Sequence, residues 1–176
     1  MEINLIACIN KVNALGKDNE LLYHISSDLK NFKSLTMNGI IIMGKNTYES
    51  LPKKPLPNRT TIIICNEENY TPFVEENKSV FVADSIPTAL GIAETLPNKN
   101  VWVIGGASIY RQFIEQGLVD KLYLTVVDDD TQGDVHFPTF GDIDYRLLFK
   151  TPTIKETERG RLLSYQFHIY EKNSHV

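Results

Sequence analysis

The sequence has few of the residues that mark disulfide scaffolds, metal centres or basic binding surfaces. Its 2 cysteines and 4 histidines, scattered along 176 residues, predict neither a disulfide framework nor a metal site. The net charge of −4 argues against nucleic acid as a partner. No segment approaches the ~20 apolar residues of a membrane helix, and the first residues lack the basic start and apolar core of a secretory signal. We therefore expect no nucleic-acid or membrane partner.

What the sequence does contain is typical of one folded domain. Apolar residues make up 42% and charged residues 23% of the chain, and no repeat or linker divides it, so we predict a single domain over residues 1–176. Cys8 and Cys65 lie in apolar runs, which predicts buried, reduced thiols and a cytoplasmic location. Because no heptad pattern is present, we expect a monomer.

Apolar runs alternate with helical segments along most of the chain, the pattern of an α/β fold. The runs predict strands at 3–9, 40–43, 60–65, 80–82, 101–104, 121–127, 145–150 and 163–169. Helices are predicted at about 26–37, from 44–47 onward, at about 86–96 and at 107–116. The expected fold is a mixed, mostly parallel central sheet of about eight strands with flanking helices and an antiparallel C-terminal strand pair.

Capping residues predict where two of these helices begin and where one ends. Ser26 or Ser27 is expected to cap the helix at 26–37, and Gly39 to end it in the left-handed conformation. Asp84 or Ser85 is expected to cap the helix at 86–96.

The helix predicted at 26–37 carries a carboxylate on an apolar face. Asp28, Phe32 and Leu35 are spaced i, i+4 and i+7, so they share one side of the helix. One interpretation is that Asp28 lies in the first turn because negative charge favours a helix start. The other is that it faces a ligand that pairs with a charge otherwise unfavourable to bury. The helix alone leaves both open.

Two glycine turns and one arginine add to the candidate chemistry. The turn at Gly105-Gly106 lets a backbone approach a phosphate, although glycine also occurs in purely structural turns and no G-x-G-x-x-G is present. Gly44-Lys45 is a second strand-to-helix junction, and two such junctions suggest a dinucleotide. Arg59 follows a proline-rich loop, where its guanidinium either binds a carboxylate bidentately or lies on the surface.

Eight segments follow one another over nearly the whole chain: Leu5-Ile6-Ala7, Gly16-x-x-Asn19, Asp28-Leu29-x-x-Phe32-Lys33, Ile42-Met43-Gly44-Lys45-x-Thr47-x-Glu49-Ser50, Pro55-Leu56-Pro57-x-Arg59, Ile104-Gly105-Gly106-x-x-Ile109-Tyr110, Leu122-Tyr123-Leu124-Thr125 and Gly133-Asp134-x-His136-Phe137-Pro138. Taken together and in this order, they resemble the dihydrofolate reductase family. The resemblance implies NADPH-dependent reduction of 7,8-dihydrofolate to 5,6,7,8-tetrahydrofolate. Hydride would pass from the nicotinamide C4 to C6, with protonation at N5.

The resemblance also implies a substrate site. Asp28 would hold the 2-amino group and N3 edge of the pterin, with Thr125 as its hydrogen-bond partner, and Arg59 would bind the glutamate α-carboxylate. The implied substrate-binding residues are Ile6, Ala7, Asp28, Leu29, Phe32, Lys33, Leu56, Arg59, Ile104 and Thr125. Of these, Ile6 and Ile104 would present backbone carbonyls, and Leu29 and Phe32 would pack on the substrate rings.

For the cofactor, the resemblance implies NADPH, with its phosphates at the two glycine junctions and a cis peptide between Gly105 and Gly106. The implied cofactor-binding residues are Ala7, Leu15, Gly16, Asn19, Gly44, Lys45, Asn46, Thr47, Cys65, Asn66, Ile104, Gly105, Gly106, Ala107, Ser108, Ile109 and Tyr110. The implied catalytic residues are Asp28, Tyr110, Thr125, Leu21 and Tyr23. The loop at 16–21 would close over the nicotinamide, steadied by the loop that carries Asp134.

The sequence departs from the family's common pattern at three places. Leu22-Tyr23 stands where a Pro-Trp pair is frequent, and Ala107 where a third glycine is often found. The segment Cys65-Asn66-Glu67-Glu68 replaces a hydroxyl-and-basic segment that often meets the 2′-phosphate. Because two glutamates there would repel a phosphate, we expect a smaller preference for NADPH over NADH than usual.

Two alternative functions remain. A pyrimidine reductase of riboflavin synthesis shares the fold and cofactor, but it does not need both Asp28 on the helix face and Arg59 in the proline loop. A nucleotide-binding module without catalysis would bind the cofactor and show no nicotinamide oxidation when dihydrofolate is added.

Overall fold

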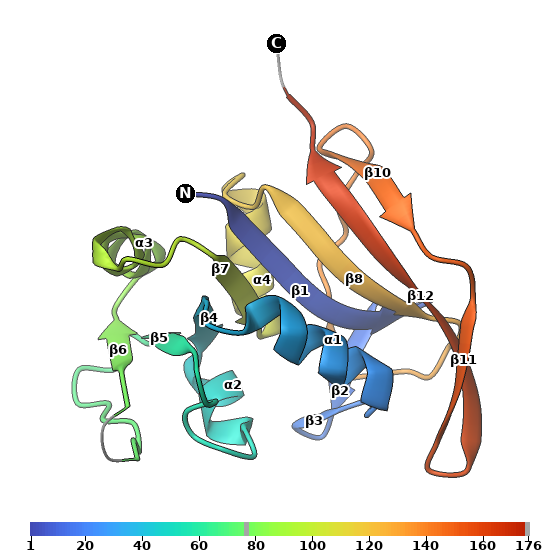
Figure 1. Cartoon of the computed structure of the whole chain (residues 1–176), viewed down its shortest axis with the longest axis horizontal. Helices are drawn as coiled ribbons and strands as arrows, with labels where there is room; N and C mark the ends of the chain where they lie inside the picture. The colour runs from blue at the N-terminus through green and yellow to red at the C-terminus, as the bar shows by residue number, and fades with distance from the viewer. Residues whose placement is uncertain (76–77, 175–176) are drawn as a thin grey trace.

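A central mixed sheet organises the molecule (Figure 1), as seen in the computed structural model, which describes residues 1–75 and 78–174. The strands are β1 (Ile3–Asn10), β4 (Ile40–Gly44), β5 (Thr60–Ile64), β6 (Val80–Ala83), β7 (Val101–Gly105), β8 (Lys121–Val127), β10 (Tyr145–Lys150), β11 (Ile154–Glu158) and β12 (Arg161–Lys172). Their order is β10-β12-β8-β1-β7-β4-β5-β6, with β11 paired to β12. From β8 to β6 all pairs are parallel, whereas β10, β11 and β8 pair antiparallel with β12. The predicted fold class is confirmed.

Helices cover both faces of the sheet. They are α1 (Ser26–Thr36), α2 (Lys45–Ser50), α3 (Ile86–Thr95) and α4 (Ala107–Glu115). Successive strand residues point to opposite faces, so Leu5 packs in the core with Phe113 of α4. Ile6, the next residue, packs in a second core with Phe32 of α1 and Tyr48 of α2. Figure 1 shows α1 lying across the strands on its face of the sheet.

The chain leaves the neighbouring strands β1 and β7 in opposite directions. From β1 it passes through α1 to β4, and from β7 it passes through α4 to β8 on the other side of β1. Pairing between β1 and β7 ends at Leu5 and Val103. In open α/β sheets, ligands bind at the carboxyl ends of strands where the connections reverse in this way. The fold therefore places Ile6 and Ile104 at the edges of such a crevice.

A second, three-stranded sheet, which the sequence did not predict, has the order β3-β2-β9. It consists of β2 (Ala14–Lys17), β3 (Glu20–Leu21) and β9 (Val135–His136). The segment at 16–21, expected as a loop, is thus a hairpin. Its turn residues Asp18 and Asn19 have φ values of 53° and 63°, and tight hairpin turns of this kind favour Asn and Asp.

Two of the predicted helix caps are wrong. The residue before α1 is Ile25, and no side chain of α1 caps its start; instead Glu156 of β11 accepts bonds from the Ser27 amide at 3.4 Å and from the Ser27 hydroxyl at 2.5 Å. After α1 it is Asn38, with φ of 58°, and not Gly39 that adopts the left-handed conformation. Ser85 caps α3 by accepting from Thr88, as predicted.

Other expectations hold in part. The strand at 121–127 has the predicted bounds. The predicted antiparallel C-terminal pair is present as β10 and β12, and β11, which the sequence did not predict, also pairs with β12. Cys8 and Cys65 are free thiols, half-buried where full burial was expected. No helix in the described part of the chain is long and apolar enough to cross a membrane.

Candidate active site

Asp28 in the first turn of α1 reaches across to β8. The Thr125 hydroxyl donates a hydrogen bond to Asp28 Oδ1 at 2.5 Å, and Cys8 lies directly beside Thr125 on the neighbouring strand β1. Burial raises the pKa of Asp28 above its ordinary value, while hydrogen bonds from Thr125 and Cys8 oppose that rise. The two donors favour the ionised acid, which is an acceptor for paired N–H groups.

Tyr110 of α4 joins the two strands that flank the crevice. Its buried hydroxyl lies 2.8 Å from the carbonyl oxygens of both Ile6 and Ile104, which share its one proton. Burial raises the pKa of this hydroxyl, so it stays protonated and remains a donor. Each carbonyl oxygen has a second lone pair. The bond therefore fixes two acceptors that a ligand in the crevice can still use.

Gly105 and Gly106 form a close backbone cradle after β7. The peptide between them is cis, as expected. Gly105 has φ of +129°, and a Cβ there would lie 3.3 Å from the Tyr110 hydroxyl oxygen. A Cβ on Gly106 would lie 3.3 Å from Thr47 Oγ1, so this turn also adjoins α2. No side chain caps the start of α4, which leaves its first amides for a ligand such as a diphosphate.

Arg59 lies beside the far end of α1, where its positive charge has no carboxylate partner within the described residues. Its Nε donates to the Pro57 carbonyl at 2.9 Å and its Nη1 to Thr36 Oγ1 at 3.2 Å. The guanidinium carbon is 6.0 Å from the centroid of the Phe32 ring. These contacts orient an uncompensated cation near an aromatic ring of α1, as binding of a ligand carboxylate requires.

The hairpin at 16–21 is tied to the loop that carries Asp134. Asp134 Oδ2 accepts from the Asp18 amide at 3.0 Å, and the Asp134 amide donates to the Gly16 carbonyl at 3.0 Å. Leu21, at the end of the hairpin, is 57% exposed. The contact between the two segments that the resemblance implied is therefore present in the structure.

The hydrogen-bond partners of the Tyr23 hydroxyl do not include Asp28. The hydroxyl donates to Asp129 and accepts from Asn10 Nδ2 at 3.0 Å, and the ring packs in a core with Ile25. Tyr23 is therefore an implied catalytic residue whose hydroxyl is hydrogen-bonded outside the Asp28–Thr125 pair. Asp129 is also paired with Arg161, so this network joins the end of the hairpin segment to the start of β12.

The remaining implied residues differ in how far they are buried. Leu56 packs in the core beneath α1, and Ala7, Gly16 and Ile109 are buried. Leu15, Gly44, Thr47, Cys65 and Ala107 are half-buried, while Leu29, Lys33, Asn19, Asn46, Asn66 and Ser108 are exposed. Lys45 is bound to Glu67.

Sequence reasoning missed Glu156 and Glu158, which accept from the Ser27 and His24 amides. No local signal marks them, because each pair is more than a hundred positions apart.

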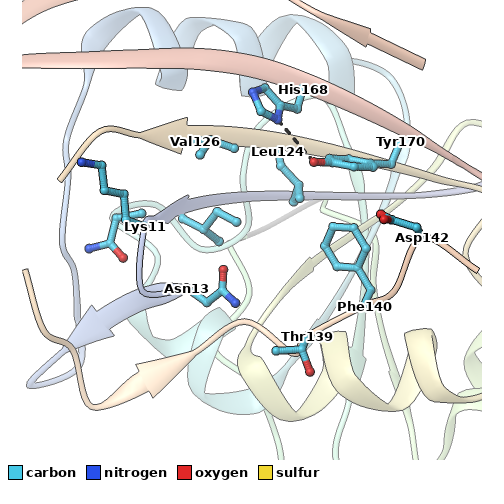
Figure 2. A pocket seen from close by; sticks show the side chains of 11 residues that line it. Lys11, Asn13, Leu124, Val126, Thr139, Phe140, Asp142, His168 and Tyr170 are labelled. Atoms are coloured by element: carbon cyan, nitrogen blue, oxygen red, sulfur yellow. Dashed lines mark hydrogen bonds between the residues drawn. The ribbon is translucent and has the colours of Figure 1, made fainter. Parts of the chain in front are cut away.

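A separate hollow lies on the opposite face of the sheet. It has a volume of about 350 Å³ and its lining includes Leu124, Val126, Phe140, His168 and Tyr170. Figure 2 shows these side chains around it, with His168 directed toward Tyr170. Because Leu124 and Val126 alternate with Thr125 along β8, this hollow is separated from Asp28 by the sheet. It is not part of the crevice.

The fold and the crevice define an α/β protein of the dinucleotide-dependent class, with an acid on one side of the switch point and a glycine cradle on the other. The family model described as dihydrofolate reductase matches residues 2–172. The chain is 36% identical over 167 residues to dihydrofolate reductase of Buchnera aphidicola subsp. Acyrthosiphon pisum, covering 95% of this chain and 96% of that protein. It is 31% identical over 172 residues to the Bacillus subtilis protein of the same name, covering 98% and 95%.

A solved structure of dihydrofolate reductase from Enterococcus faecalis, complexed with NADP(H) and RAB-propyl, matches with a TM-score of 0.80 at 26% identity, over 98% of this chain and 97% of that one. The chain belongs to the dihydrofolate reductase family.

Proposed function

We propose that the chain catalyses the NADPH-dependent reduction of 7,8-dihydrofolate to 5,6,7,8-tetrahydrofolate. One observation carries the proposal: Thr125 holds the Asp28 carboxylate beside β1, and Tyr110 links the Ile6 carbonyl of the same strand to the glycine cradle at Gly105-Gly106. An acid fixed beside a dinucleotide cradle has a use in reducing a nitrogen heterocycle. A sheet that only binds nucleotide does not require it.

The substrate is bound through three kinds of contact. Asp28 accepts hydrogen bonds from the 2-amino group and N3 edge of the pterin, and the carbonyls of Ile6 and Ile104 accept from the other side. Leu29, which is 46% exposed on α1, and Phe32 cover the rings. At the far end, Arg59 binds the α-carboxylate of the glutamate tail, while Lys33 and Leu56 line the same end.

The residues around the glycine cradle fit the diphosphate of NADPH. The cradle at Gly105-Gly106 and the uncapped amides of α4 take the diphosphate, because a side chain at either glycine would crowd the approach. Thr47 lies against the same turn. When bound, NADPH supplies the hydride that passes from the nicotinamide C4 to C6 of the pterin.

Asp28 and the hairpin at 16–21 complete the reaction. Asp28 orients the pterin and stabilises its protonated form, while N5 receives a proton through water. The hairpin, held by its contact with Asp134, excludes bulk water and fixes the distance between the reacting carbons. The hydrogen bonds between the hairpin and Asp134 keep this cover in place.

A spectrophotometric assay tests the proposal. Purified protein with NADPH should oxidise it only when dihydrofolate is added, and Asp28→Asn should remove most of that activity. Cofactor binding without turnover would identify a non-catalytic module. Turnover of a riboflavin-pathway pyrimidine, with none of dihydrofolate, would identify the alternative reductase. We also place the protein in the cytoplasm, since both its thiols are free; cell fractionation tests that location.

A further inference from the structure

Lys45, the first residue after the β4 glycine junction, is held by two contacts. Its Nζ donates to Glu67 Oε2 at 2.6 Å and lies 5.1 Å from the centroid of the Tyr70 ring. The Tyr70 hydroxyl in turn donates to Glu49 at 2.6 Å, and Glu49 lies 3.6 Å from Lys54 Nζ. The ammonium group is thus fixed by a carboxylate and a ring.

The charges of this cluster leave no positive surplus. Two glutamates, Glu49 and Glu67, neutralise Lys45 and Lys54, and Glu68 follows Glu67 in the sequence. A phosphate monoester carries about −1.5 to −2 charges at neutral pH. Binding one here would break the Lys45–Glu67 pair or bring the phosphate close to an acid.

The cluster lies at one end of the path that a dinucleotide must follow. Asp28 and Thr125 mark the pterin end, over β1 and β8. The glycine cradle follows at the end of β7, and β4 and β5 are the next strands. Gly44 pairs with Ile64 at their carboxyl ends, so Lys45 and Glu67 both emerge there. A cofactor with its nicotinamide toward Asp28 and its diphosphate in the cradle places its adenosine ribose at this pair.

We propose that Glu67 determines the cofactor selectivity of this chain. Glu67 keeps Lys45 neutralised and offers an acceptor to a ribose 2′-hydroxyl, as an acidic residue does in other dinucleotide sites. NAD(H) then binds nearly as well as NADP(H). This inference rests on the proposed function only in assuming that a nicotinamide dinucleotide lies in the crevice.

Dissociation constants for NADP⁺ and NAD⁺, measured by calorimetry without substrate, test the inference. For the native chain, the two dissociation constants should lie within ~10-fold of each other. Glu67→Gln, which removes the charge and frees Lys45, should tighten NADP⁺ by ~10-fold and change NAD⁺ by less than about threefold. Glu68→Gln is the matched control: it makes the same charge change beside the pair, no bond joins Glu68 to Lys45, and its effect should stay within about threefold.

A double-mutant cycle distinguishes an effect of the Lys45–Glu67 pair from the general effect of removing one negative charge. If Glu67 acts through Lys45, then Lys45→Gln should abolish the gain that Glu67→Gln gives for NADP⁺. A native preference for NADP⁺ above ~100-fold, or equal effects of the two glutamate variants, would overturn the inference. Failure to bind either dinucleotide would instead overturn the proposed function.

Discussion

The hydroxyl of Thr125 on β8 is bonded to the carboxylate of Asp28 on α1, across the carboxyl end of β1. This bond opposes the rise in pKa that burial causes at Asp28. Thr125→Val keeps the shape and removes the donor, so the pKa of Asp28 should rise further. The acid limb of the kcat/KM profile should move to higher pH, with about a tenfold loss at neutral pH, on the scale of a hydrogen bond to a charged group.

Thr125→Ser is the control for that change, since it keeps a hydroxyl in place. Its pH profile should overlay that of the native enzyme. If the valine and serine variants gave the same profile, the bond would have no role in ionising Asp28, and Thr125 would only fill space beside Cys8.

Arg59 gives a prediction about the substrate tail. Its guanidinium has no carboxylate partner among the described side chains and is oriented by Pro57 and Thr36. Arg59→Lys should raise KM for dihydrofolate by about tenfold, because lysine cannot form two parallel bonds. A pterin substrate without the glutamate tail serves as the internal control and should respond little. Equal losses for both substrates would assign Arg59 to structure rather than recognition.

The sequence predicted those features that depend on neighbouring residues. The apolar run that predicts a strand at 121–127 and the Ser85 cap are local, and the structure has both the strand and the cap. The start of α1 was predicted at the right residue, but its cap was predicted wrongly, because Glu156, which accepts from the Ser27 amide, lies 129 positions away. The pairing of β2 with β9 is likewise long-range, and no pattern within either short strand indicates it.

In the candidate site too, local features were predicted from the sequence and long-range contacts were not. Spacing alone placed Asp28 on one face with Phe32, but left its role open between helix start and ligand. Its partner Thr125 is 97 positions away and followed only from the family resemblance. The resemblance gave no role for Asp129 or Asn10, because both bind the tyrosine at position 23, where this chain departs from the common pattern.

The contact between the hairpin at 16–21 and Asp134 predicts that closure of this hairpin depends on one carboxylate. Asp134→Ala removes the acceptor for the Asp18 amide, and a lost hydrogen bond of about 1 kcal/mol corresponds to about a fivefold smaller ratio of closed to open hairpin. Single-turnover hydride transfer should slow by that factor, with unchanged thermal stability. Asp134→Asn keeps a side-chain oxygen and should retain most of the rate. A fall in stability without a change in rate would make the contact structural.

The most direct prediction concerns Asp28 itself. Because burial raises its pKa, the ionised acid destabilises the ligand-free fold. That penalty is absent below the ordinary pKa, where the acid is protonated in both the folded and unfolded states, and it reaches its full size above the raised one. Asp28→Asn should therefore leave the free energy of unfolding at neutral pH unchanged or higher. At low pH the two proteins should differ little.

Activity of Asp28→Asn should change far more than stability. Asparagine is nearly isosteric, but it cannot stabilise a protonated pterin, so turnover at neutral pH should fall by ~10²–10⁴-fold. Binding of NADPH should barely change, since the cradle lies on β7 and α4. The remaining activity should increase as the pH falls, because solvent then supplies more protonated substrate. A folded variant that binds NADPH and turns over within about twofold of the native rate would remove Asp28 from the mechanism.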